Sequence, residues 1–350
     1  MGLGFNLWPI KGTCRSEARL DGKTVVITGG NCGIGKEVVR DLYWRGARVV
    51  LLCRDVEKAK HAMDEIKRNP PNNFRARMQP ASSAGNMLVH TLDLGSFDSV
   101  RECAKIVLET ESAIHILINN AGVYAPVQTK TRDGNEIHYQ VNHLGHVLLT
   151  LLLLPKIRAN APCCRIVIMA SVIHIVGRIN LNETNLDSSY SKTMAYSRSK
   201  LANILFAQEL TRRFKAEKIE GINVYMVHPG LVKSEIIRDM NHTICCGCHL
   251  FTRVLQYIGF VKNTEEGAQT LIHCAVSEKA ANETGLYYSA CKPASLASRG
   301  TRPDYIRRCW EMTCTMLQLD FTLTLDDLSN EAAKKLPARS TEISSSYTKF

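Results

Sequence analysis

The chain has 350 residues, 45% of them hydrophobic, which is enough for one large α/β domain with extensions or for two small domains. Its formal net charge of +11 is spread along the chain and favours anionic partners such as phosphorylated cofactors or acidic membrane surfaces. Aromatic residues make up only 7% and no base-reading motif is present, so the sequence argues against a nucleic-acid-binding protein.

The N-terminal ten residues do not have the pattern of a secretory signal, because no basic start is followed by a sustained apolar run. We therefore expect the thirteen cysteines to be reduced, in an intracellular protein that is not secreted. The cluster Cys245-Cys246-Gly247-Cys248-His249 has no second cysteine pair at finger-like spacing, so no metal site is predicted. Met1-Gly2 could begin a myristoylation motif, but that motif requires Ser or Thr at position 6, where this chain has Asn6, so the sequence argues against this modification.

A glycine-rich turn follows the earliest predicted strand. Residues 23–28 (KTVVIT) form a β-branched run typical of a buried parallel strand. The turn Gly29-Gly30-Asn31-Cys32-Gly33-Ile34-Gly35 then opens a helical pattern that continues to Arg45. Glycines let the backbone approach a pyrophosphate, and a helix N-terminus supplies N–H donors and partial positive charge. We predict nucleotide binding at this turn.

The second predicted strand, residues 47–53, is followed directly by Arg54. An NAD-binding protein usually has a carboxylate there for the ribose diol, whereas an arginine suits a 2′-phosphate. Asp55 follows, but it also fits as the N-cap of a helix over 56–68. The sequence therefore favours NADP(H) over NAD(H).

Strands and helices alternate through the rest of the chain. Further strands are predicted at 87–92, 114–118, 165–170, 223–227 and 285–288, and helices at 97–111, 133–154, 191–218 and 264–274. This order predicts a doubly wound, mostly parallel sheet with helices on both faces, a single-domain Rossmann fold of class α/β. We expect the domain at 22–310, an N-terminal extension at 1–21 and a partly loose C-terminal extension at 311–350.

Two helical stretches are almost entirely apolar, 147–154 and 201–206. Both are too short to span a bilayer, and Pro155 is expected to end the helix that contains the former. Two interpretations remain open for such helices: a homodimer interface, or burial inside the monomer. Residues 231–262 also mix apolar residues and cysteines, which would suit a substrate lid, a membrane-touching patch or a packed amphipathic helix.

Tyr196 and Lys200 lie four residues apart in the helix predicted at 191–218, so they share one helix face. A free tyrosine has a pKa of about 10, and a fixed positive charge beside it favours the phenolate. The pair could therefore act as an acid and base in carbonyl–alcohol interconversion. An exposed lysine beside a packed tyrosine is the alternative for an isolated pair of this kind.

Several of these motifs occur together in the order of one family. The turn 28–35, Asn119-Asn120-Ala121-Gly122, Asn142, Ser171, the Tyr196/Lys200 pair and Pro229-Gly230 resemble the short-chain dehydrogenase/reductase superfamily over about residues 22–308. Within it, Gly33-Ile34-Gly35-Lys36-Glu37, Leu52-Cys53-Arg54-Asp55 and Val141-Asn142-His143-Leu144-Gly145-His146 are similar to the retinol dehydrogenase branch, which usually uses NADP(H).

The resemblance implies a role for each matching residue. Tyr196 would exchange a proton with the substrate oxygen, Lys200 would bind the cofactor ribose and lower the tyrosine pKa, and Ser171 would hydrogen-bond the substrate oxygen. Asn142 would hold a water in a proton relay. The cofactor would also contact Asp93, which could alternatively cap the next helix, and the other implied residues: Gly29, Asn31, Cys32, Gly33, Ile34, Gly35, Arg54, Asn119, Ala121, Gly122, Pro229, Gly230, Val232 and Ser234.

The implied activity is an NADP(H)-dependent oxidoreductase that interconverts an apolar alcohol and its aldehyde or ketone, as a retinol dehydrogenase does. A steroid, a fatty aldehyde or a xenobiotic ketone is the alternative substrate, and a nucleotide-binding scaffold without catalysis is the alternative class. Members of the branch often have a longer apolar N-terminal anchor than residues 3–10 provide. We therefore expect a cytosolic protein, or one attached peripherally to the cytosolic face of the endoplasmic reticulum.

Overall fold

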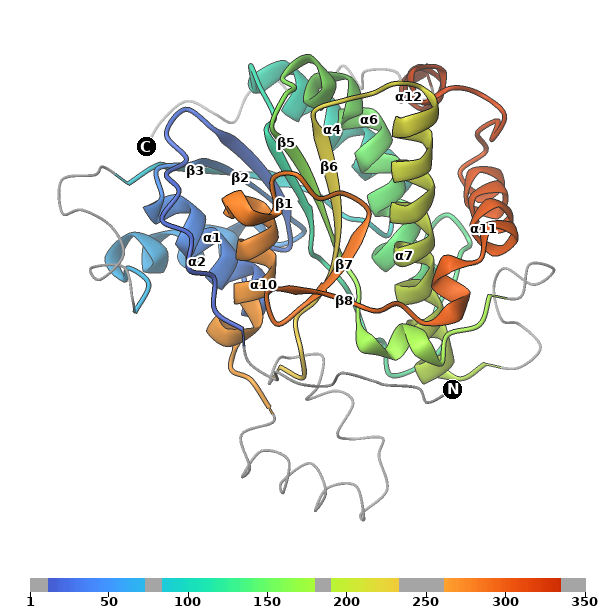
Figure 1. The fold of residues 1–350 in the computed structure, drawn as a ribbon, viewed down its shortest axis with the longest axis horizontal. Helices are drawn as coiled ribbons and strands as arrows, with labels where there is room; N and C mark the ends of the chain where they lie inside the picture. The colour runs from blue at the N-terminus through green and yellow to red at the C-terminus, as the bar shows by residue number, and fades with distance from the viewer. Residues whose placement is uncertain (1–11, 73–83, 180–189, 233–260, 335–350) are drawn as a thin grey trace, which may run out of the picture.

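A single sheet of eight strands forms the centre of the computed structural model, which describes residues 12–72, 84–179, 190–232 and 261–334 (Figure 1). The strand order is β3-β2-β1-β4-β5-β6-β7-β8, and every neighbouring pair is parallel except β7 and β8. The strands are β1 (Thr24–Thr28), β2 (Arg48–Cys53), β3 (Asn86–Thr91), β4 (Ile116–Asn119), β5 (Cys164–Met169), β6 (Ile222–His228), β7 (Leu286–Ser289) and β8 (Lys292–Ala294).

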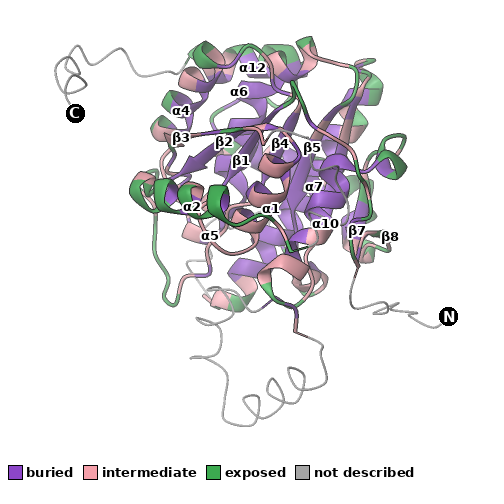
Figure 2. Ribbon diagram, turned by 90° about the vertical axis from the view of Figure 1, so that its left-hand side faces the viewer, coloured by how far each residue is buried: buried purple, intermediate pink, exposed green. Residues whose placement is uncertain are grey.

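Helices cover both faces of the sheet, which confirms the predicted doubly wound architecture (Figures 1 and 2). One face carries α1 (Gly33–Trp44), α2 (Val56–Arg68) and α10 (Thr264–Val276), and the other carries α4 (Phe97–Thr110), α6 (Gly145–Ala159) and α7 (Lys192–Ala216). Alternation along β1 explains the two cores: Val25 and Ile27 pack on the α1 face, and Val26 packs on the α6 face. Apolar residues on both sides are what a buried parallel strand requires.

The order of strands places the crevice of the sheet between β1 and β4. The chain leaves β1 toward β2 on one side and later returns to β4 on the other. Ligands bind at such a switch point, outside the carboxyl ends of the strands. The glycine-rich turn after β1 and the turn after β4 therefore meet at this edge.

The helix predicted at 133–154 is interrupted. A short α5 (Ile137–Tyr139) leads into a π-helical turn of five residues, Gln140–Leu144, before α6 begins at Gly145. The prediction that Pro155 ends the helix is wrong, because α6 continues to Ala159 with Pro155 inside it. Two contacts hold the last turn of α6, although Pro155 has no backbone N–H to donate. Ile157 is buried in the core, and Lys156 Nζ donates hydrogen bonds to the backbone oxygens of Leu108 and Glu111.

The apolar helices α6 and α7 are covered within the same chain. α12 (Leu325–Lys334) packs on α6, and α11 (Pro303–Met316) packs on α7 (Figure 1). The indole of Trp310 stacks on Phe206 with ring centroids 6.2 Å apart, and the Arg213 guanidinium lies 4.7 Å from the same indole. Burial inside the monomer therefore accounts for both apolar stretches, and among the described residues 147–154 no apolar side chain is left for a subunit partner.

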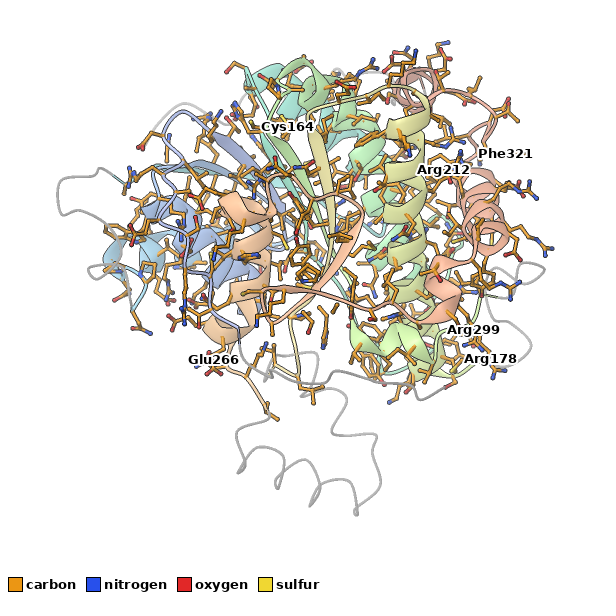
Figure 3. All side chains as sticks on the ribbon, in the orientation of Figure 1. Cys164, Arg178, Arg212, Glu266, Arg299 and Phe321 are labelled. Atoms are coloured by element: carbon orange, nitrogen blue, oxygen red, sulfur yellow. The ribbon has the colours of Figure 1, made fainter. Side chains whose placement is uncertain are left out.

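The C-terminal part is ordered beyond the boundary expected near residue 310, which falls within α11. Cys314, Leu317 and Leu325 are buried in the main core. The connection between α11 and α12 is fixed by Arg213, whose two terminal nitrogens donate to the backbone oxygens of Phe321 and Leu323 at 2.8 Å each (Figure 3 labels Phe321). Residues 311–334 therefore pack on the main core of the domain.

The sheet ends in a hairpin that the sequence did not predict. A turn of two residues, Ala290 and Cys291, joins β7 to the antiparallel β8, and both have positive φ (50° and 61°). Paired positive φ values match the twist of a tight hairpin.

Among the described residues, no helix combines the length and the apolar character needed to cross a bilayer.

Candidate active site

A cavity of about 900 Å³ lies along the carboxyl edge of the sheet, walled by the loops that follow strands β1 to β6. Most of the predicted site residues line it: Gly29, Asn31, Cys32, Gly33, Ile34, Gly35, Arg54, Asp93, Ala121, Gly122, Ser171, Tyr196, Lys200, Pro229, Gly230 and Val232. Asn119 and Asn142 are not on its wall. Ser234, the remainder of the predicted lid and the Cys245–Cys248 cluster lie outside the described residues.

The glycine-rich turn requires its glycines. Gly29 and Gly33 have positive φ (+68° and +55°), and a Cβ on Gly35 would lie 2.1 Å from the backbone oxygen of Gly29. A Cβ on Gly33 would meet nothing within 4 Å. Helix α1 begins here without a side-chain cap, so the N–H groups of its first turn remain for a ligand on the cavity side. This cradle fits the pyrophosphate of a dinucleotide.

Arg54 and Asp55 at the end of β2 differ in what they contact. Asp55 accepts a hydrogen bond from the backbone N–H of Lys58 at 2.8 Å, which confirms it as the N-cap of α2. Arg54 is exposed on the cavity wall and makes no ion pair or hydrogen bond with the part of the chain that the structure describes. The guanidinium therefore remains for an anionic group on the ligand.

Asp93 lines the cavity next to the loop that follows β3. Its Oδ1 accepts from the backbone N–H of Gly95 at 2.9 Å, and its own N–H donates to Ser99 Oγ at 2.9 Å. The alternative of a helix cap is wrong, because Ser96 is the N-cap of α4. The side chain stays beside the cavity, where the cofactor contact was expected.

Of the two asparagines after β4, Asn120 lines the cavity and Asn119 does not. Asn119 is the last residue of β4 and points into the core, where its Nδ2 donates to Thr150 Oγ1 at 2.8 Å. Asn120 Nδ2 donates to the backbone oxygens of Thr28 and Gly29, at 2.9 and 3.2 Å. The side chain of Asn119 therefore lies away from the cavity, whereas Asn120 lines it and ties the turn after β4 to the turn after β1.

Asn142 lies in the π-helical turn, and its side chain forms hydrogen bonds with two segments next to the cavity. Its Oδ1 accepts from the N–H of Val123 at 2.7 Å, and its Nδ2 donates to Val123 O at 3.1 Å and Ser199 Oγ at 3.0 Å. The side chain is fully buried and both of its amide hydrogens are used. It therefore joins the loop after β4 to α7, and its expected role of holding a water in a proton relay stays a prediction.

Ser171, Tyr196 and Lys200 meet on the cavity wall. Ser171 follows β5, while Tyr196 and Lys200 lie one turn apart on α7, both buried. Lys200 Nζ lies 5.7 Å from the centroid of the Tyr196 ring and donates to the backbone oxygen of Met169 at 3.3 Å. A phenol, a hydroxyl and an ammonium group on one wall can exchange a proton with a bound oxygen and hold its charge.

The expected lowering of the Tyr196 pKa is wrong for the protein groups alone. Burial raises the pKa of Tyr196, and the nearby Tyr124 raises it further. Burial also lowers the pKa of Lys200 to about 8. The direction of the Tyr196 shift is therefore determined by burial and by Tyr124, and a sequence does not reveal how deeply a side chain is buried.

The sequence analysis did not select His228, which lines the cavity, or Lys262, which contacts the turn beside it. His228 ends β6 and lines the cavity, and its Nδ1 accepts from the N–H of Val172 at 3.3 Å. Burial, then the charges of Lys262 and His174, lower the pKa of His228 to about 3, so it is neutral at physiological pH. Lys262 Nζ donates to Pro229 O at 3.0 Å and fixes the Pro229-Gly230 turn. His228 directly precedes Pro229-Gly230 in the sequence, and this position was the signal that could have identified it.

The fold and the site together define a dinucleotide-dependent oxidoreductase of the doubly wound α/β class. Comparisons with known proteins agree. The family model described as short chain dehydrogenase matches residues 23–244. The chain belongs to this family, and it is an oxidoreductase that acts on CH–OH groups with a nicotinamide cofactor.

Among similar proteins, human (Homo sapiens) retinol dehydrogenase 12 is 42% identical over 306 residues, covering 87% of this chain and 90% of that protein. Human retinol dehydrogenase 11 is 42% identical over 310 residues, covering 88% and 90%. A crystal structure of an uncharacterized protein from Mycobacterium Paratuberculosis has a TM-score of 0.69 at 29% identity, covering 89% of this chain and 100% of that one. The Pseudomonas aeruginosa RhlG/NADP complex shares the fold, with a TM-score of 0.58 at 24% identity, covering 77% and 94%.

Proposed function

We propose that the protein is an NADP(H)-dependent retinol dehydrogenase or retinal reductase, interconverting an apolar alcohol and its carbonyl form. The observation that carries this proposal is the Ser171, Tyr196 and Lys200 set on the wall of the cavity that also contains the glycine cradle. About 40% identity to retinol dehydrogenases over most of the chain supports the substrate class.

The environment of Arg54 supports NADP(H) over NAD(H). The Arg54 guanidinium lies on the cavity wall without a partner among the described residues, and Asp55 is engaged as a helix cap. A 2′-phosphate can be gripped by a guanidinium through two hydrogen bonds, whereas a free carboxylate in its place would bind the ribose diol. The dinucleotide would therefore lie from Arg54, along Gly29–Gly35, to Ser171.

Part of the cavity wall is apolar, which supports an apolar substrate. Val172 and Ile173, which follow Ser171 in the chain, line the cavity together with Leu231 and Val261. Apolar walls with few polar groups bind a hydrophobic molecule and orient it by its one polar oxygen. Ser171 and Tyr196 are the groups positioned to receive that oxygen.

A nicotinamide cofactor held in this cavity would supply the hydride in reduction and accept it in oxidation. Tyr196 donates its phenolic proton to the carbonyl oxygen in reduction and accepts it in oxidation, while Ser171 holds the oxygen by a hydrogen bond. Because burial raises the pKa of Tyr196, the phenol is protonated at neutral pH and ready to donate. Lys200 supplies the positive charge that compensates the phenolate left behind.

A turnover assay tests the proposal. The purified full chain is offered retinal, steroid ketones, fatty aldehydes and xenobiotic ketones, each with NADPH and with NADH. We expect the highest kcat/KM for retinal with NADPH. A preference for another carbonyl would reject retinal as the substrate, and absence of turnover with every carbonyl would favour a nucleotide-binding scaffold.

A further inference from the structure

Two rings pack edge-on against Tyr196 on the side away from the cavity. The ring centroid of Tyr124 lies 5.4 Å from that of Tyr196, and the centroid of His138 lies 6.2 Å away, each with an interplanar angle of 77°. Tyr124 and His138 also contact each other, with centroids 5.8 Å apart. Tyr196 lines the cavity, whereas neither supporting ring does. Edge-to-face packing of this kind fixes the relative orientation of rings.

The hydrogen bonds of His138 determine its tautomer. The backbone N–H of Ala125 donates to Nε2 at 2.9 Å, so this nitrogen carries no proton. The proton of the neutral ring is then on Nδ1, which donates to Glu136 Oε1 at 2.6 Å. With one bond at each nitrogen, the imidazole cannot rotate without breaking both.

Glu136 is in turn held by the backbone. Oε1 also accepts from the N–H of His138 at 3.0 Å, and Oε2 accepts from the N–H of Tyr139 at 2.9 Å. Both side chains of the Glu136–His138 pair are fully buried. Burial would raise the pKa of Glu136, but the bonds from His138 and Tyr139 outweigh it and the pKa is lowered, so the carboxylate is charged.

The second supporting ring is attached to the helix of Tyr196 itself. The hydroxyl of Tyr124 lies 3.3 Å from Thr193 Oγ1, one turn before Tyr196 on α7. Lys192 Nζ lies 5.9 Å from the centroid of the Tyr124 ring. Each ring that packs against Tyr196 is therefore held in place. His138 is bonded to Glu136, and Tyr124 is bonded to α7.

We propose that Glu136 and His138 are positioning residues for Tyr196: the carboxylate fixes the imidazole, and the imidazole and Tyr124 keep the phenol in place on the cavity wall. The inference rests on the proposed function, in which Tyr196 transfers a proton. A rotation of the ring away from the substrate oxygen would slow that step without weakening cofactor binding, because displacements of about 1 Å can cost about 10²-fold in rate.

The test compares His138→Ala, which removes the ring, with His138→Phe, which restores a ring but neither hydrogen bond. With retinal and NADPH, kcat of His138→Ala is expected to fall about 10- to 100-fold, with NADPH affinity unchanged. His138→Phe should recover part of this loss. The isotope effect on kcat with 4-deuterated NADPH should increase in His138→Ala, because the chemical step becomes slower.

His273→Ala is the matched control, since His273 is also buried and packs on Tyr288, but it lies in α10 on the opposite face of the sheet. It should lose thermal stability without the specific loss in kcat. If His138→Ala does not fold, Tyr124→Leu removes the other ring while keeping an apolar side chain in part of its space, and the same loss in kcat is expected.

The outcomes separate this inference from the proposed function. An active wild type with a folded His138→Ala variant of unchanged kcat and isotope effect overturns the inference alone. A His138→Ala variant whose losses in NADPH affinity and kcat are parallel and match those of His273→Ala also overturns it, because its role is then structural. A wild type inactive on every carbonyl overturns the proposed function and the inference with it.

Discussion

The two ends of the cavity are built differently. At the cradle end, Gly29, Gly33 and Gly35 present backbone, and the N–H groups that begin α1 remain for a ligand. At the proton-transfer end, Tyr196 and Lys200 are buried side chains whose neighbours determine their ionisation. The cradle end would bind the cofactor through its shape and its backbone dipoles, whereas the proton-transfer end would act through the protons of Tyr196 and Lys200. Substitutions at the cradle should therefore change binding, whereas those at α7 should change turnover.

Tyr196→Phe should break the proton-transfer end alone. The phenyl ring keeps the packing against Tyr124 and His138 but has no proton to transfer. We expect kcat for carbonyl reduction to fall about 10³-fold, within the range for loss of a general acid. Steady-state kinetics and a fluorescence titration with NADPH check this; substantial turnover would contradict the assignment of Tyr196.

Gly35→Ala should break the cradle alone. The new Cβ would lie 2.1 Å from the backbone oxygen of Gly29, so the turn must move. Overpacking costs about 1–3 kcal/mol, and the upper value corresponds to about 10²-fold in NADPH affinity. The control is Gly300→Ala, whose Cβ comes no nearer than 3.2 Å to a side-chain methyl of Ile204. Equal NADPH affinity in the two variants would argue against a pyrophosphate site at the turn.

Arg54→Asp should change the choice of cofactor and leave the chemical step intact. Losing a charged hydrogen bond of about 2 kcal/mol corresponds to a decrease of about 30-fold in the NADPH-to-NADH ratio of kcat/KM. Arg68→Asp, at the exposed end of α2, makes the same charge change away from the cavity. An unchanged ratio in Arg54→Asp would reject the 2′-phosphate contact.

The pH dependence of reduction should report Lys200. Its pKa is lowered to about 8 by burial, so it loses its charge as the pH rises through that value. The reduction rate should thus be constant below about pH 7 and about tenfold lower at pH 9, where about one lysine in ten stays charged. Rates measured under saturating NADPH would show this; a rate that rises across the same interval would contradict a role for the charged lysine.

The sequence predicted the sheet well because its strands are apolar and β-branched on both faces, as in residues 24–28 and 48–53. It also placed the glycine turn, Ser171 and the Tyr196/Lys200 pair at the cavity, since each follows a strand end or occupies one helix face. These are local patterns that can be recognised without knowledge of contacts between distant segments.

What the sequence could not predict depends on contacts between distant segments. The π-helical turn forms around Asn142, whose side chain binds Val123 and whose backbone oxygen accepts from Asn203 Nδ2 at 3.0 Å. The ionisation of Tyr196 depends on its burial and on Tyr124, which a distant segment of the chain brings beside it. The choice between Asn119 and Asn120 depended on where β4 ends, and strand ends are hard to place from a sequence alone.

The short hairpin strand β8 has a consequence for the behaviour of the protein at high concentration. It pairs antiparallel with β7 and carries Pro293, which offers no backbone N–H to a further strand. A sheet whose margin is blunted in this way resists edge-to-edge polymerisation with neighbouring molecules. Three residues at the margin thereby help to protect a large apolar sheet from aggregation.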